Sequence, residues 1–206
     1  MTAFNQIKKL SGAIALIAVS VSCGDVVRTG RSPVYLVIDQ LTATPGEVGG
    51  TGSQQTNVLQ SDVAVNSPDP CSYVTPCIYN DGGKVQMRAL AKDVTATSPS
   101  SNSEVTINRY HVTYRRADGR NTPGVDVPYG FDGALTGTTV DGKLILTFEL
   151  VRHDAKMEPP LIQLGNNYAV ITSLAEVTFY GRDQVGNDVS VSGSIQVDFG
   201  NFADKK

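Results

Sequence analysis

The chain of 206 residues and 21.9 kDa is long enough for one sizeable domain and leaves little room for a second. Its formal net charge of −3 argues against a nucleic-acid binder that works through a large basic surface. With 40% apolar and 18% charged residues it lies far from the disordered class. Twenty glycines among many Val, Thr and Ser residues predict a mostly β protein.

The N-terminal residues have the three parts of a secretory signal. Lys8 and Lys9 precede the apolar run 10–23, which ends in small residues. This run is shorter than the roughly 20 residues of a membrane-spanning helix. We therefore expect residues 1–22 to be a cleaved signal peptide.

The end of this signal, Ser20-Val21-Ser22-Cys23, resembles the lipobox of bacterial lipoproteins. Ser22 and Cys23 match that family, whereas Ser20 stands where leucine is usual. The resemblance implies that Cys23 becomes the first mature residue and carries a lipid such as palmitate. Residues 23–33 would then be a lipidated tether that holds a domain over 34–203 at a cell-envelope membrane. The alternative is ordinary cleavage near Ser22, which leaves Cys23 as a thiol.

The other two cysteines, Cys71 and Cys77, lie in the segment DPCSYVTPC. Export into an oxidising compartment predicts a disulfide between them. Lipidation of Cys23 would remove the odd thiol of the three. The chain-entropy model gives roughly 2–2.5 kcal/mol for so small a loop. The spacing is not that of a redox motif, and neither of the two histidines lies near enough to suggest zinc.

Alternation of apolar and polar residues predicts about seven strands. A change of parity after Ile107 predicts a β-bulge near Asn108 and Arg109. Segment 167–176 is ambiguous, and no segment after residue 23 has a sustained helical period. The strands are predicted at residues 34–41, 57–65, 85–92, 105–115, 144–151, 176–181 and 189–199.

The segment 179–187, FYGRDQVGN, followed by an alternating strand, resembles the final hairpin of bacterial immunoglobulin-like domains. Those hairpins often carry a D-x-x-G-N turn. The resemblance implies an all-β, antiparallel immunoglobulin-like β-sandwich of about seven strands. The tryptophan and inter-sheet cysteines of antibody domains are missing, so a bacterial or fibronectin-like variant is meant. The whole chain is also similar to uncharacterised single-domain bacterial lipoproteins, and this implies no activity.

Sequence patterns of catalysis are missing from the chain. It contains no G-x-S-x-G, H-E-x-x-H, P-loop or G-x-G-x-x-G motif. His111 and His153 have no nucleophile at a telling spacing, so we interpret them as surface or packing residues. We expect no enzyme, and a hydrolase with dispersed residues is the remaining catalytic alternative. Four arginines are interpreted as a solvated face with ordinary ion pairing: Arg109, Arg115, Arg116 and Arg120.

A calcium site is one binding hypothesis, although no cofactor is required. In an immunoglobulin-like strand order the last hairpin turn and loop 93–104 share one end of the sandwich. Oxygen ligands for calcium would converge there. The alternative is that these residues fill turns by capping the backbone. The residues concerned are Asp93, Glu104, Asp183, Asn187 and Asp188.

An aromatic loop at 118–137 is the second binding hypothesis. Tyr129 and Phe131 lie there among glycines, prolines and acids, and exposed rings can stack on sugars or anchor a partner. The alternative is that both rings fold back over the core.

Location, fold class and the missing catalytic motifs predict a membrane-anchored exported lipoprotein. We expect it to act as a non-catalytic binding or assembly module of the bacterial envelope. Its partner would be an envelope protein or a glycan, at the periplasmic or the outer surface. The alternative is a carbohydrate-binding lipoprotein that uses the 118–137 loop.

Overall fold

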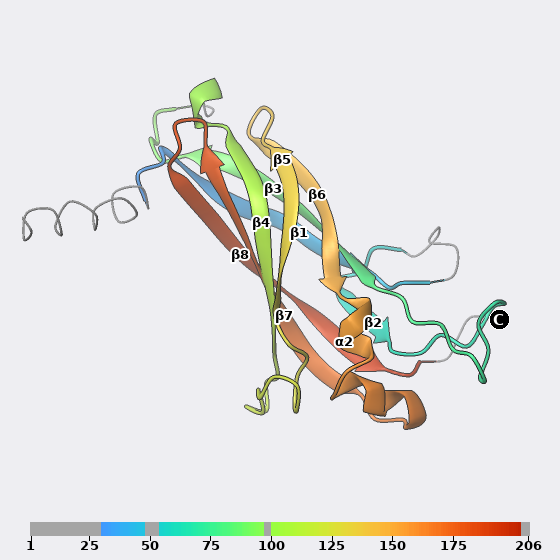
Figure 1. Cartoon of the computed structure of the whole chain (residues 1–206). Coiled ribbons are helices and arrows are strands. Elements are labelled where there is room, and N and C mark those ends of the chain that lie inside the picture. The colour runs from blue at the N-terminus through green and yellow to red at the C-terminus, as the bar shows by residue number, and fades with distance from the viewer. Residues whose placement is uncertain (1–29, 48–53, 97–99, 203–206) are drawn as a thin grey trace, which may run out of the picture.

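The alternating segments form two β-sheets that pack face to face (Figure 1). The structure is a computed structural model that describes residues 30–47, 54–96 and 100–202. The three-stranded sheet has the order β1-β3-β6, and the five-stranded sheet has the order β2-β8-β7-β4-β5. The strands are β1 (Val34–Thr44), β2 (Val58–Asp62), β3 (Asp81–Ala91), β4 (Val105–Arg115), β5 (Phe131–Thr138), β6 (Lys143–Val151), β7 (Ile171–Asp183) and β8 (Asp188–Gly200).

Strand pairing is antiparallel except between the edge strand β2 and the last strand β8, which are parallel. The predicted bulge in β4 is confirmed, because its pairing with both neighbours shifts between Ile107 and Arg109. The extra residue turns Ile107 and Tyr110 to the same face, where both are buried.

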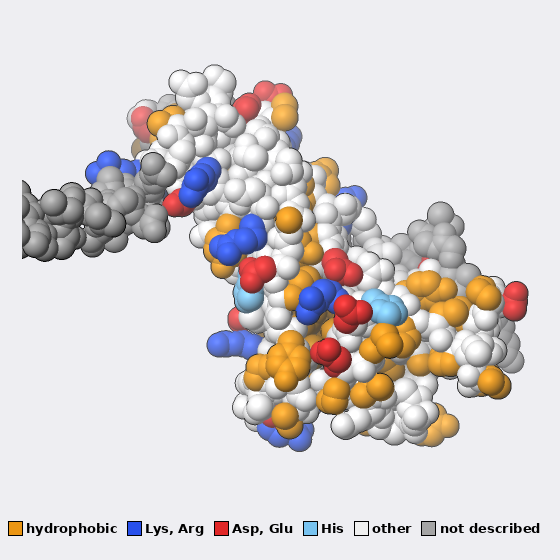
Figure 2. All heavy atoms as spheres, viewed as in Figure 1, with side chains coloured by type: hydrophobic (Ala, Val, Ile, Leu, Met, Phe, Trp, Pro, Cys, Tyr) orange, Lys and Arg blue, Asp and Glu red, His pale blue; other side chains and the backbone are white. Residues whose placement is uncertain are grey.

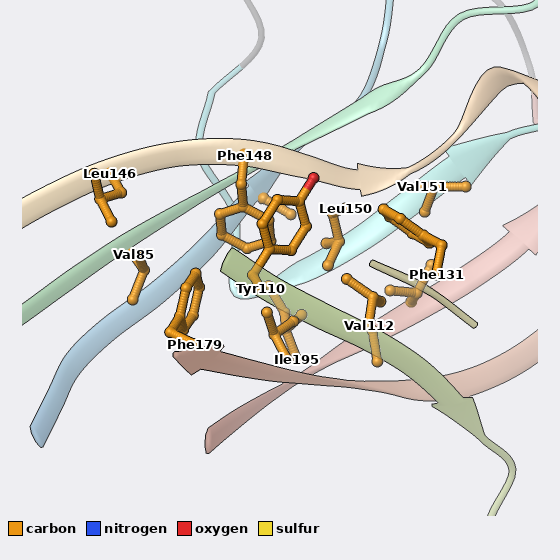
Figure 3. Close-up of a cluster of buried hydrophobic side chains, with 14 of the residues drawn as sticks. Val85, Tyr110, Val112, Phe131, Leu146, Phe148, Leu150, Val151, Phe179 and Ile195 are labelled. Atoms are coloured by element: carbon orange, nitrogen blue, oxygen red, sulfur yellow. The ribbon is translucent and has the colours of Figure 1, made fainter. Parts of the chain in front are cut away.

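The core lies between the two sheets and has an aromatic centre (Figure 3). Phe148 of β6 meets Tyr110 of β4 and Phe179 of β7 edge to face, with ring centroids 5.2 Å apart in each pair. Aliphatic side chains from both sheets surround these rings. The predicted all-β sandwich is confirmed.

Each of the seven predicted strands is present, and the structure adds β5. The 118–137 segment is therefore a loop only as far as residue 130. Two short helices follow β6 and were not predicted: α2 (His153–Lys156) and η2 (Leu161–Asn166). Most of the ambiguous segment 167–176 belongs to β7, which begins at Ile171.

The predicted signal peptide and Cys23 lie outside the described residues. The description of the tether begins at Gly30, whose carbonyl accepts a hydrogen bond from Lys92 Nζ at 3.0 Å. Pro33 O accepts another from the Lys92 amide at 2.8 Å. Among the described residues, no helix is long and apolar enough to cross a membrane.

The sandwich has two ends, which we call the proximal and distal poles (Figure 1). The proximal pole holds the described start of the chain, residues 92–96 and 100–104, and the β7–β8 turn. The distal pole holds segments 63–80, 116–130 and 152–170 together with residues 201 and 202. Pairing of Val34 with Ala91 and of Asp62 with Gly200 fixes these assignments.

Candidate binding groove

A groove of about 720 Å³ opens at the distal pole, within the range of small-molecule sites. Side chains from four separate segments line it: 63–78, α2, 162–168 and 201–202. Figure 2 shows hydrophobic side chains gathered over this lower right part of the molecule. Its lining combines aromatic, aliphatic and amide side chains, including Tyr73, Tyr168, Phe202, Ile162, Asn166 and Asn201.

The first wall of the groove is the continuation of β2 and the loop after it. Val63 N donates to Gly200 O, and Val65 exchanges two hydrogen bonds with Cys77, all at 2.9 Å. Cys71 and Cys77 form the predicted disulfide, with Cα atoms 5.3 Å apart. The bridge closes the loop that carries Tyr73, whose side chain is 88% exposed at its tip.

The second wall is η2 and the turn that follows it. Leu161 and Leu164 are buried and fix η2 to the core. Asn167 then orders the turn, since its Nδ2 donates to Gln163 O at 2.6 Å and its Oδ1 accepts from the Ala169 amide at 2.8 Å. Tyr168 projects from this turn fully exposed.

A buried ion pair lies at the base of the groove. Lys156 Nζ is 2.9 Å from Asp81 Oδ2, and neither side chain has any exposed surface. Lys156 also donates to Asp62 O at 2.9 Å, while Asp81 accepts from Ser61 Oγ at 2.6 Å and from Gly46 N at 2.8 Å. Burial raises the pKa of Asp81, and the Lys156 ammonium and the hydrogen bonds oppose this rise.

This ion pair determines the charge of the groove. Among the described residues that line it, Lys156 carries the one formal charge, and Asp81 neutralises it from beneath. The groove therefore presents aromatic rings and amides without a net charge.

The predicted ligand residue Phe131 is not at a surface, so that prediction is wrong. Phe131 begins β5, is 7% exposed and packs edge-on to Tyr110 at 6.0 Å. The Arg152 guanidinium covers its ring at 4.5 Å. Tyr129 is 53% exposed at the distal pole but does not line the groove. A role for Tyr129 in binding stays a prediction.

The predicted calcium ligands lie at the proximal pole, and two of their segments meet. Gln184 N in the last turn donates to Glu104 O at 3.2 Å. The carboxylate of Asp183 accepts bonds from the Val185 amide at 3.0 Å and from Asn187 N and Nδ2, both at 2.8 Å. Burial alone would raise the pKa of Asp183, yet these hydrogen bonds outweigh it and lower the pKa.

The remaining calcium candidates also have partners of their own. Asp188 pairs with Arg182 at 2.7 Å, and Asp93 accepts from Thr95 N at 2.9 Å and Thr95 Oγ1 at 2.7 Å. Within the described residues, no three His, Cys, Asp or Glu side chains are placed to hold one metal ion. Calcium binding stays a prediction, and the capping alternative accounts for the contacts of Asp183 and Asp93.

The two histidines take no part in the ion pair at the base of the groove. His111 Nδ1 lies 3.2 Å from Asp132 on the neighbouring strand, and His153 Nδ1 lies 3.1 Å from Asp154. Both imidazoles are partly exposed, and their contacts are those of surface residues. The absence of an enzymatic activity stays a prediction.

All four arginines have ion-pair partners, but only three are exposed, since the side chain of Arg116 is largely covered. Arg116 and Arg120 approach Asp118 to 2.7 and 2.9 Å, and their hydrogen bonds hold its pKa well below the usual value. Arg115 lies 3.6 Å from Glu176. On the same sheet, Arg109 stacks over the Tyr180 ring at 4.3 Å and lies 3.8 Å from Asp132.

Comparisons with family models, with curated proteins and with solved structures returned no match to this chain. The functional argument therefore depends on the chemistry of the groove itself. Sequence reasoning missed the groove, because Tyr73, Asn166, Tyr168 and Phe202 come from distant segments. Two sequence features could have indicated these residues: Tyr73 lies inside the small cysteine loop, and Tyr168 follows two asparagines.

Proposed function

We propose that this protein is an exported lipoprotein, anchored through Cys23, that acts as a non-catalytic binding module of the bacterial cell envelope. The observation that carries the proposal is the position of the groove at the pole opposite the start of the domain. Strand β8, of 13 residues, runs between the poles and spans roughly 40 Å. A lipid at Cys23 would therefore leave the groove facing away from the membrane.

The immunoglobulin type of the sandwich is part of this proposal. The order β1-β3-β6 agrees with strands A, B and E of that fold, and β8-β7-β4-β5 agrees with G, F, C and C′. In this assignment the β7–β8 turn corresponds to the F–G loop, so the groove lies at the end opposite the binding loops of antibody variable domains. Loops held by a rigid scaffold at either end can carry binding residues. The Cys71–Cys77 disulfide supports export, since such bonds persist in oxidising compartments.

Membrane fractionation of cells that produce the full chain tests the anchor. We expect the wild-type protein in the membrane fraction and Cys23→Ser in the soluble exported fraction, because serine cannot take the thioether-linked lipid. Ser22→Ala is the matched control and should remain membrane-bound, since it keeps a small residue before the cysteine. Equal membrane binding of Cys23→Ser would refute the lipid anchor.

Crosslinked affinity isolation of the tagged protein from intact cells, followed by mass spectrometry, tests the binding role. We expect a recurrent stoichiometric envelope component that is lost with Tyr168→Ala, because Tyr168 is fully exposed at the groove. Thr95→Ala, at the proximal pole, is the control. Recovery of no component above background would argue against a module of envelope assembly.

A further inference from the structure

We propose that the distal groove binds an uncharged saccharide, with the rings of Tyr73 and Tyr168 as stacking surfaces and asparagine side chains as hydroxyl partners. This inference rests on the proposed binding function and names the ligand class of the same site.

The charge of the groove selects for a neutral ligand. Lys156 is fully buried and bound to Asp81 at 2.9 Å, so it offers no cation to a phosphate or carboxylate. The remaining described lining residues carry no formal charge. Transfer of a charged ligand group into such a site would cost solvation without an ionic partner in return. An uncharged ligand avoids this cost.

The aromatic side chains are placed as open surfaces. Tyr73 and Tyr168 are 88% and fully exposed, and they stand on opposite walls of the groove. Phe202 adds a half-buried ring to the lining. A pyranose ring has faces made largely of C–H groups, and these pack favourably on the electron-rich face of an aromatic ring. Exposed rings beside a groove suit that geometry.

The amide side chains that line the groove can hydrogen-bond to the hydroxyl groups of a sugar. A hydroxyl both donates and accepts, and an asparagine side chain offers both functions. Asn166 is exposed at the groove, and no hydrogen bond within the described residues engages its side chain. Asn201 donates through Nδ2 to Gly165 O at 2.7 Å, which fixes its orientation and leaves Oδ1 as an acceptor.

An extended peptide fits this site less well. Peptides that add to a sheet need an unpaired strand edge. In the groove wall, the backbone of Val63 is bonded to Gly200 and that of Val65 to Cys77, so these two residues offer no free backbone groups on that side. The disulfide and the anchored η2 helix also hold the two walls in place before a ligand arrives, which lowers the entropic cost of binding.

The test uses the detergent-solubilised full-length lipoprotein on an array of neutral and anionic glycans, followed by titration calorimetry. The calorimetric probes are chitotetraose, maltotetraose and cellotetraose, with tetragalacturonate as the anionic probe. We expect at least one neutral glycan to bind, and Tyr168→Ala and Tyr73→Ala each to raise its Kd about tenfold. Tetragalacturonate should bind at least tenfold more weakly than the best neutral probe.

Tyr129→Ala is the matched control, because Tyr129 is an exposed tyrosine at the same pole outside the groove. It should change Kd by less than twofold, and a loss confined to this variant would move the saccharide site to the 118–137 loop. Binding of no neutral glycan at millimolar concentration would overturn the inference. A protein partner lost with Tyr168→Ala would then preserve the binding-module proposal, whereas no partner of either kind would end both.

Discussion

Lys156 and Asp81 form a buried ion pair at the junction of α2, β3 and the end of β2. Such a pair gains little net stability, because its attraction must offset the desolvation of both charges. Loss of one partner is different, since it strands the other charge without solvent. Here a stranded carboxylate would keep only the hydrogen bonds from Ser61 and Gly46.

Lys156→Met should therefore lower the free energy of unfolding by about 3–5 kcal/mol, measured by urea denaturation. The double variant Lys156→Met with Asp81→Asn should recover most of this loss, because no charge is then buried. A single variant that costs less than about 1 kcal/mol would show that water reaches the pair.

Asp183, the last residue of β7, should make the stability of the protein depend on pH. Its hydrogen-bonded carboxylate has a pKa below the ordinary 3.8, so its contribution is complete above that value and is lost as pH falls through the folded pKa. Asp183→Asn should lower the free energy of unfolding by about 1–2 kcal/mol at pH 7. This difference should shrink steadily below pH 3.8. A difference that is independent of pH would assign the effect to shape instead of charge.

At the scale of the elements, two adjacent glycines of β3 have opposite roles. A Cβ on Gly83 would collide with the Phe148 ring, whereas a Cβ on Gly82 would meet open space. Gly83→Ala should lower the free energy of unfolding by about 1–3 kcal/mol, because Phe148 is held between Tyr110 and Phe179. Gly82→Ala is the control and should stay within about 0.5 kcal/mol. Equal effects in thermal denaturation would contradict this packing.

Strand β5 shows why one element was not predicted. Its inward positions are Phe131, Gly133, Leu135 and Gly137, so glycine replaces half of the apolar signal. The structure supplies the reason, since the Tyr110 ring occupies the space beside Gly133 and Leu146 the space beside Gly137. The strands with full alternation were predicted, because one covered face repeats every second residue. The two glycines of β5 were not predicted as inward positions, because the need for glycine there comes from side chains on other strands.

At the scale of the whole molecule, the proposed lipid anchor at Cys23 predicts that the two poles lie at different distances from the bilayer. Val94 at the proximal pole and Val125 at the distal pole are both well exposed. A fluorophore on Val94→Cys should transfer energy to labelled lipid headgroups more efficiently than one on Val125→Cys, since β8 spans roughly 40 Å between the poles. Equal transfer from the two positions would mean that the sandwich lies flat on the membrane.

The sequence also could not predict the groove. Its walls come from segments 63–78 and 162–168 and from Phe202, and only the tertiary fold brings them together. The Lys156–Asp81 pair, which makes the groove neutral, likewise joins α2 to β3. The disulfide was predictable because both cysteines lie within one short loop.

The parallel pairing of β2 with β8 has a consequence for the order of assembly. Val58 pairs with Gln196 and Asp62 with Gly200. Strand β2, near the start of the domain, can therefore pair only after β8 has been made. During synthesis from the N-terminus, β1 can pair with β3 long before β8 has been made. One wall of the groove continues directly from β2. The groove is therefore completed only after the final strand has formed, and a chain truncated before β8 would lack it.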